Sequence, residues 1–170
     1  MWSYGYRNPW RLRVDPHLGV LVGSAMWKDK PQQVNAPHSG DNAGYPEVET
    51  PCWTDGVLAP SCSTTAAGTP IAPPVLEYGP EVGDILSGVA VPGPDAGPLA
   101  GTVVVSDWKG AVLAATPGES PWATTPVELP PAASRGGYLW DLDADAAGHL
   151  YLMYTGTSMT GGTLLRLSAP

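Results

Sequence analysis

Short apolar runs that alternate with polar residues recur along the chain, and glycine or proline separates them. In residues 10–14, Trp10, Leu12 and Val14 share one face of a predicted strand, because successive side chains of a strand point to opposite sides. No segment keeps the apolar spacing of an amphipathic helix for three turns without a glycine or proline. The pattern therefore predicts an all-β protein.

The same alternation predicts eight strands, joined by turns rich in Pro, Gly and Asp. They are expected at residues 10–14, 18–23, 84–91, 101–106, 111–115, 137–142, 149–154 and 163–167. Many short strands joined by turns are typical of a sandwich, a barrel or a propeller.

A weak internal repeat favours the propeller. Residues 10–22 and residues 139–152 each read as a strand, a turn that contains Asp and Gly, and a second apolar strand. Such a unit is typical of a propeller blade. We therefore expect residues 1–170 to form a single partial β-propeller domain with about three four-stranded antiparallel blades. The blade-like units are expected at about 7–35, 84–130 and 137–168, with a long loop rich in Pro, Gly, Ser and Thr at 36–83.

The charge of the chain argues against two classes of partner. Its formal net charge is −8, and its eight Lys and Arg residues form no run or stripe. Nucleic acids and anionic membrane surfaces bind clustered cations, so neither is expected as a partner. No run of 18 apolar residues occurs, so no membrane-spanning helix is expected.

Cys52 and Cys62 are the only cysteines, and nine residues lie between them in a stretch rich in Pro, Thr and Ser. Their spacing predicts a local disulfide bond, and the alternative is a pair of free thiols. No histidine or further cysteine stands at zinc-ligand spacing beside them. A disulfide favours an extracellular or periplasmic location. Residues 1–7 lack the apolar core of a signal peptide, so we expect either a cytosolic protein or a sequence without its natural N-terminus.

Several motifs resemble, in the same order, those of the glucose/sorbosone dehydrogenase family. Residues 5–9 (Gly-Tyr-Arg-Asn-Pro), followed by Asp15 and Pro16, look like its Gly-x-Arg-Asn-Pro signature. The Gln-Val-Asn at 33–35 and the Gly-Asp-Asn-Ala-Gly-Tyr-Pro at 40–46 are similar to its next block. Weaker matches follow at 76–78, 87–91, 99–108 and 150–152. The resemblance covers nearly the whole chain and corresponds to the C-terminal half of the family.

The resemblance implies a six-bladed propeller that oxidises a sugar by hydride transfer to pyrroloquinoline quinone (PQQ), with Ca²⁺ as a second cofactor. In that family the Arg and Asn of the signature contact the quinone, which points to Arg7 and Asn8. A Lys of a later blade pairs with the quinone's carboxylates, and Lys109 matches it. The alternative for Arg7 is a guanidinium that holds a blade edge through backbone carbonyls, and for Lys109 a solvated loop lysine. Cys52 and Cys62 also fall where many members carry a loop pair.

The sequence departs from the family at the site itself. Residues 23–27 (Gly-Ser-Ala-Met-Trp) carry no acidic or amide side chain, although this segment supplies calcium and quinone contacts in the family. Tyr138 and Trp140 stand where sugar-oxidising members carry arginines. The family's base is a His of an earlier blade that this sequence does not contain, so we assign no catalytic residue and no metal ligand. The chain's own histidines are poor candidates, in turns or at a strand start: His17, His38 and His149.

Two functions are compatible with these features. The first is a quinone-dependent sugar dehydrogenase, incomplete or degenerate in this chain, and whether the chain is an enzyme stays open. The second is a non-catalytic, propeller-derived interaction or structural module. Either one predicts another chain or a second copy that completes the propeller, because an open propeller exposes an apolar flank. A sugar is a candidate ligand, and the loop residues Trp27 and Trp53 are candidates to contact it.

Overall fold

The computed structural model describes residues 1–25, 29–49, 51–129, 137–156 and 160–167. In these residues the regular elements are β-strands and two short 3-10 helices, so the all-β prediction is confirmed. Neither described helix has the length and apolarity needed to cross a bilayer. Trp27 and the prediction made for it lie outside the described residues.

The strands are β1 (Ser3–Tyr4), β2 (Pro9–Asp15), β3 (Gly19–Ser24), β4 (Gln32–Asn35), β5 (Asp41–Asn42), β6 (Trp53–Thr54), β7 (Val57–Leu58), β8 (Leu76–Tyr78), β9 (Leu86–Ala90), β10 (Val103–Asp107), β11 (Val112–Thr116), β12 (Ala123–Pro126), β13 (Tyr138–Ala144), β14 (Leu150–Thr155) and β15 (Gly162–Leu167). The 3-10 helices are η1 (Pro60–Cys62) and η2 (Gly97–Leu99).

The chain divides into two compact units. The first contains Met1–Ile85 and Gly118–Trp122, and the second contains Leu86–Pro117 and Ala123–Pro170. Each unit is described by itself. The sequence predicted one domain over 1–170, and that statement stays a prediction.

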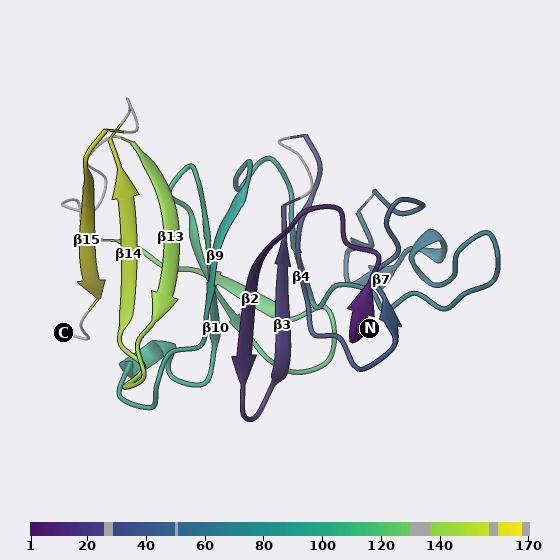
Figure 1. The fold of residues 1–170 in the computed structure, drawn as a ribbon, viewed down its shortest axis with the longest axis horizontal. Helices are drawn as coiled ribbons and strands as arrows, with labels where there is room; N and C mark the ends of the chain where they lie inside the picture. Colours follow the sequence, from purple (N-terminus) through teal and green to yellow (C-terminus); the bar gives the residue numbers. More distant parts are fainter. Residues whose placement is uncertain (26–28, 50, 130–136, 157–159, 168–170) are drawn as a thin grey trace. The chain divides into compact units, whose positions relative to one another are not determined.

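The main sheet of the first unit has the strand order β2-β3-β4-β8, and every neighbouring pair is antiparallel. Figure 1 shows β2, β3 and β4 in the dark colours of the N-terminal part. Leu21, Val34 and Leu76 are fully buried on this sheet. The strands form because apolar and polar positions alternate along β2 and because β3 is a continuous apolar run, as expected of a strand buried on both faces.

The stretch 36–83, predicted as a long loop, contains regular structure, and that part of the prediction is wrong. β8 closes the main sheet of the first unit, β5 pairs with β1, and β6 forms a hairpin with β7. A small core lies within this stretch and consists of Val48, Cys52, Cys62 and Ile71, with Trp53 and Leu58 of the hairpin packed against it. Strands of two or three residues are too short to show an apolar alternation, so the pattern could not reveal them.

Two sheets form the second unit, with the orders β9-β10-β11-β12 and β13-β14-β15, all antiparallel. Figure 1 shows β13, β14 and β15 side by side in green to yellow. Their apolar faces share one core, which consists of Ala90, Val104, Val112, Leu139, Leu142, Leu150 and Leu152. Gly88 allows the two sheets to approach closely, because a Cβ at that position would lie 2.5 Å from the Leu142 backbone nitrogen.

Three antiparallel blade-like sheets therefore contain most of the described strand residues, and the predicted fold class is confirmed. The first two sheets have four strands each, whereas the third has three in the part that the structure describes. The strand order within each sheet follows the chain, with the short elements β5 to β7 inserted before β8. This consecutive antiparallel order is how a propeller blade is built.

Candidate functional site

The segment that carries Arg7 and Asn8 is fixed by backbone hydrogen bonds on both sides. The Asn8 carbonyl accepts a hydrogen bond from the Ala25 N–H at 3.1 Å, which ties it to the end of β3. The Gly5 carbonyl accepts one from the Tyr45 N–H at 2.8 Å. Gly5 has φ +78°, and a Cβ there would clash with the Asn42 side chain, so only glycine fits this turn. These hydrogen bonds and the turn at Gly5 therefore fix the backbone of Arg7 and Asn8 just before β2.

Arg7 already has an acidic partner. Its Nε lies 3.1 Å from Oε1 of Glu49, and both side chains are partly exposed. An exposed ion pair of this kind contributes at most about 1 kcal/mol. An incoming carboxylate can therefore compete for the guanidinium at modest cost, but it must displace or share Glu49.

The end of β3 lies beside Asn8 and corresponds to the segment that departs from the family pattern. Ser24 pairs with Pro9 across the sheet and with Gln33 on its other side. Its Oγ is buried and has no hydrogen-bond partner. A buried hydroxyl without a protein partner is uncommon, because buried polar groups are usually hydrogen-bonded.

Lys109 lies in the second unit, in the tight turn between β10 and β11. The buried Asp107 caps this turn, since its Oδ1 accepts the Lys109 N–H at 2.8 Å. Gly110, at φ +93°, completes the turn by donating its N–H to the Asp107 carbonyl. The Lys109 residue is exposed, and its backbone is held rigidly.

Two aromatic residues occupy the neighbourhood of this turn. Tyr138 and Trp140 pack on Trp108, with ring centroids 5.3 and 5.1 Å from its ring. A backbone hydrogen bond from Leu139 to the Trp108 carbonyl holds the cluster together. These aromatic residues stand where the resemblance led us to look for arginines, so positions 138 and 140 offer aromatic surface where positive charge was expected.

The cysteines form the predicted disulfide bond, with Cα atoms 5.5 Å apart. Glu77 on β8 holds the loop that contains it, because one carboxylate oxygen accepts the N–H groups of Cys52 and Trp53 and the other accepts the side chain of Gln33. Burial raises the pKa of Glu77, and these hydrogen bonds only partly offset it. Trp53 is anchored too, since its indole N–H donates to the Pro74 carbonyl. Both residues therefore stabilise the loop.

His149 has a carboxylate partner that sequence reasoning did not assign. Its Nδ1 lies 3.0 Å from Oδ2 of Asp145, and the Tyr151 hydroxyl donates to the same oxygen at 3.1 Å. Desolvation alone would raise the pKa of Asp145, but the hydrogen bonds from His149, Tyr151 and the turn backbone outweigh it and lower the pKa to about 2. The signal was available in the sequence as an Asp four residues before a His, with Gly148 between them.

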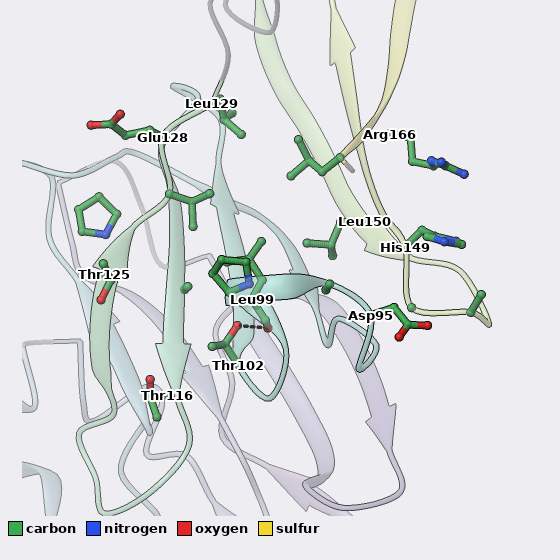
Figure 2. A pocket seen from close by; sticks show the side chains of 18 residues that line it. Asp95, Leu99, Thr102, Thr116, Thr125, Glu128, Leu129, His149, Leu150 and Arg166 are labelled. Atoms are coloured by element: carbon green, nitrogen blue, oxygen red, sulfur yellow. Dashed lines mark hydrogen bonds between the residues drawn. The ribbon is translucent and has the colours of Figure 1, made fainter. Parts of the chain in front are cut away.

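An open groove of about 820 Å³ lies in the second unit. Figure 2 shows Leu99, Leu129 and Leu150 around it, with Arg166 and His149 on its β14–β15 side. The groove runs over the core shared by the two sheets, because several of its lining residues pack against that core. Its lining is mainly apolar. Within the described ranges, no group of three or more His, Cys, Asp or Glu is placed to hold a metal ion.

The structure thus brings Arg7 and Asn8 together with Ser24 and Glu49 in the first unit, while Lys109 belongs to the second. Asn8 and Lys109 are exposed, and Arg7 is partly exposed. Sequence reasoning missed Glu49, whose partner Arg7 is distant in the sequence, and Asp145, although its spacing to His149 was visible there.

No family model matches the sequence. No curated protein matches it either. Solved structures do match. One is a glucose dehydrogenase with 23% identity and a TM-score of 0.71, of which the match covers 46%, along with 100% of this chain. The soluble aldose sugar dehydrogenase from Escherichia coli, in the apo-form, has 22% identity and a TM-score of 0.73, with 47% of it and 100% of this chain covered.

This chain has the fold of a sugar dehydrogenase. The PQQ-bound aldose sugar dehydrogenase from Streptomyces coelicolor agrees, with 20% identity and a TM-score of 0.68 over 99% of this chain and 45% of that one. The chain spans about half the length of these solved structures. Sequence identities of 20–23% establish a shared fold and nothing more. The predicted resemblance to glucose/sorbosone dehydrogenases is therefore confirmed for the fold.

Proposed function

We propose that the chain forms part of a quinone-dependent sugar dehydrogenase propeller and binds PQQ through Arg7 and Asn8 of the first unit, while Lys109 of the second unit stays a separate candidate contact. When bound, PQQ accepts the hydride that leaves the sugar carbon. The observation that supports this best is the rigid Arg7–Asn8 segment at the start of β2, in a chain whose fold matches a PQQ-bound aldose sugar dehydrogenase over 99% of its length.

The residues fit the carboxylates of the quinone. Arg7 supplies a partly exposed guanidinium, and Glu49 is its weak competitor. Asn8 adds an exposed amide next to it. In the second unit, Lys109 presents an exposed ammonium on a rigid turn, and it is a separate candidate for an anionic ligand. The unpartnered hydroxyl of Ser24 is a further polar group near Asn8.

The described residues do not fit Ca²⁺. This ion takes about six to eight oxygen ligands, several of them carboxylates. Residues 23–25 offer backbone carbonyls and one hydroxyl, and the described part of the chain contains no acidic cluster of the size that a metal needs. We therefore propose no role for calcium in the chemistry of this chain.

Sugar oxidation also needs a base for the hydroxyl proton. The three histidines are exposed and lie in turns or at a strand start, and each is tied to a nearby Asp, His17 through its backbone and His38 and His149 through their rings. None is proposed as the base. The complete reaction therefore requires a base from elsewhere in a full propeller. The disulfide supports an oxidising compartment, extracellular or periplasmic, as the place of action.

The test is a titration of the chain with PQQ, followed by Trp fluorescence. We expect saturable binding, and Arg7→Ala should weaken it by about tenfold or more, because a hydrogen bond between charged groups contributes about 1.5–3 kcal/mol. The matched control is Arg166→Ala, which removes an exposed Arg of β15 outside the proposed site. Equal affinities for wild type and Arg7→Ala would contradict the proposal.

A second candidate is a non-catalytic module that keeps the propeller scaffold to assemble with another chain. The packing of Tyr138 and Trp140 on Trp108 favours it, because these aromatic residues replace expected arginines with a stable cluster. This candidate predicts no PQQ binding in the titration. It also predicts that the wild type and Arg7→Ala give the same fluorescence in the presence of PQQ.

A further inference from the structure

We propose that the groove of the second unit is a binding site for an uncharged, mainly apolar small molecule that carries a hydrogen-bonding group. The residues that line the groove all belong to this unit, and they come from β11, β12, β14, β15 and the connections beside them. Thr102 of the lining comes just before β10, whereas the Lys109 turn follows β10, so the groove and that turn lie at opposite ends of the strand. The inference does not depend on PQQ binding.

Apolar side chains line the groove on two sides. On one side, Ala114 of β11 pairs with Thr125 of β12, so both project to the same face of their sheet, and Val127 follows two residues later. On the other side, Leu150 and Leu167 are directly paired across β14 and β15. Leu150 belongs to the core shared by the two sheets, and Val127 and Leu167 pack against it. The groove is therefore an opening over an apolar core.

Backbone contacts fix the end of the groove that lies between η2 and the β13–β14 turn. The Gly93 N–H donates to the Gly148 carbonyl at 3.0 Å, and a Cβ at Gly148 would clash with the Gly93 backbone. The two segments can approach this closely because both residues are glycines. The Thr102 hydroxyl donates to the Leu99 carbonyl at 2.8 Å, which holds the end of η2 in place (Figure 2). The groove is therefore preformed, as small-molecule sites usually are.

The size and lining of the groove suit a small molecule. Its volume is about 820 Å³. Sites for small molecules commonly measure about 300–1,000 Å³ and have a mainly apolar lining. Leu99, Val127, Leu129 and Leu167 are only partly buried, so a ligand that covers them removes further apolar surface from water. Burial of this surface is the main source of affinity that the groove offers.

The charged side chains lie at the rim of the groove. Figure 2 shows the charged ends of four lining residues pointing away from the leucines at the centre of the groove, namely Asp95, Glu128, His149 and Arg166. The rim carries acidic and basic groups together, so it favours neither an anion nor a cation. A charged group placed among the leucines would lose its hydration without gaining a partner, which is costly. We therefore infer that the occupant is uncharged.

Two threonines add polar contacts to the apolar lining. Thr116 of β11 and Thr125 of β12 are exposed and line the groove. A hydroxyl can both donate and accept a hydrogen bond, so either residue can pair with one polar group of a ligand whose remainder packs on the leucines. A few polar groups in an apolar pocket fix the orientation of a ligand. This combination defines the proposed ligand class.

The test uses N-phenylnaphthylamine, an uncharged aromatic amine whose fluorescence rises in apolar surroundings. We expect saturable binding, measured by fluorescence and by isothermal titration calorimetry. Thr125→Trp should weaken this binding by about tenfold or more, because the indole would occupy the groove beside Ala114. The matched control is Thr124→Trp, since Thr124 is also exposed but pairs with Ala115 and projects from the opposite face of β12. It should bind the amine as tightly as the wild type does.

The charge of the ligand is tested with anilinonaphthalenesulfonate, which is the same kind of aromatic amine with one added sulfonate. It should bind the wild type more weakly by about tenfold or more, because the groove has no place for an anion. Circular dichroism and thermal unfolding check the fold of each variant. Thr116→Trp, on the neighbouring strand, replaces Thr125→Trp if that variant does not fold.

Several results would overturn the proposal. They are no saturable binding of the amine by the wild type, unchanged binding by the tryptophan variant of the groove, or equal affinities for the amine and its sulfonate. Light scattering adds a further check, because a wild-type oligomer that Thr125→Trp dissociates would mean that a second copy fills the groove. Titration with PQQ is a separate measurement, so failure of this site and failure of quinone binding can be told apart.

Discussion

At the scale of single residues, the ion pair between Arg7 and Glu49 decides how available the guanidinium is. The two side chains are partly exposed and 3.1 Å apart, so their interaction is weak but competes with any ligand carboxylate. We expect Arg7 to bind an anionic ligand more tightly when its side chain is not paired with Glu49.

Replacing Glu49 by Gln should therefore strengthen PQQ binding by up to about fivefold, the equivalent of about 1 kcal/mol. The same fluorescence titration measures it. Glu128→Gln is the control, because it removes an exposed carboxylate of the second unit that is not paired with Arg7. Weaker binding by Glu49→Gln would mean that Glu49 positions Arg7 and does not compete with the ligand.

Asp145 predicts a pH dependence of stability. Its pKa is about 2 in the folded protein, below the ordinary value of 3.8, so the folded state favours the ionised form. The resulting stability is fully present above pH about 4 and is lost as the pH falls towards 2. Urea unfolding at several pH values should show this loss. In Asp145→Asn the free energy of unfolding should change less between pH about 4 and 2 than in the wild type. The same pH dependence in both proteins would contradict the lowered pKa of Asp145.

The disulfide was predictable because the two cysteines lie within about ten residues of each other. A motif just as local singled out Arg7 and Asn8, and their role in binding stays a prediction. The partner of Arg7 is 42 positions away, and Glu77 holds a loop about 25 positions away. These contacts join residues that are distant in sequence and meet only when the chain folds. Apolar alternation and motif spacing describe neighbouring residues, so they could not predict these contacts.

At the scale of elements, Gly88 explains how two blade-like sheets pack. A methyl group at Gly88 would lie 2.5 Å from the Leu142 nitrogen and 2.7 Å from its Cβ, which is closer than atoms tolerate. Because the main obstacle is backbone, it cannot move aside without shifting β13.

Gly88→Ala should lower the free energy of unfolding by about 1–3 kcal/mol, as overpacking does. Gly118→Ala is the matched control, because nothing lies within 4 Å of a Cβ at that position. Urea unfolding of the three proteins measures both effects. A Gly88→Ala protein as stable as the control would mean that the two sheets are less tightly packed than described.

The longer strands were predicted well, and the shorter ones were not. Predicted residues 10–14 and 149–154 correspond to β2 and β14, where alternation runs for several residues. β4 and β8 were missed, although they complete the first sheet. β4 consists of Gln32–Asn35, whose polar side chains are buried and therefore give no apolar signal.

At the scale of the whole chain, three consecutive antiparallel sheets define the fold, and the sequence indicated it through a repeated strand–turn–strand unit. Composition could not indicate that the chain has two compact units, because that division depends on long-range contacts. The match to glucose and aldose sugar dehydrogenases extends over the entire chain.

The most direct test of this account is a PQQ titration of wild type, Lys109→Ala, Arg7→Ala and the double variant. We expect Arg7→Ala to weaken binding, because Arg7 is proposed to bind a carboxylate of PQQ. Weaker binding by Lys109→Ala, and a double variant that departs from the sum of the two effects, would add Lys109 to the residues that bind the same ligand. Binding that survives both substitutions, or no saturable binding by the wild-type chain, would contradict the claim that this propeller segment holds the quinone.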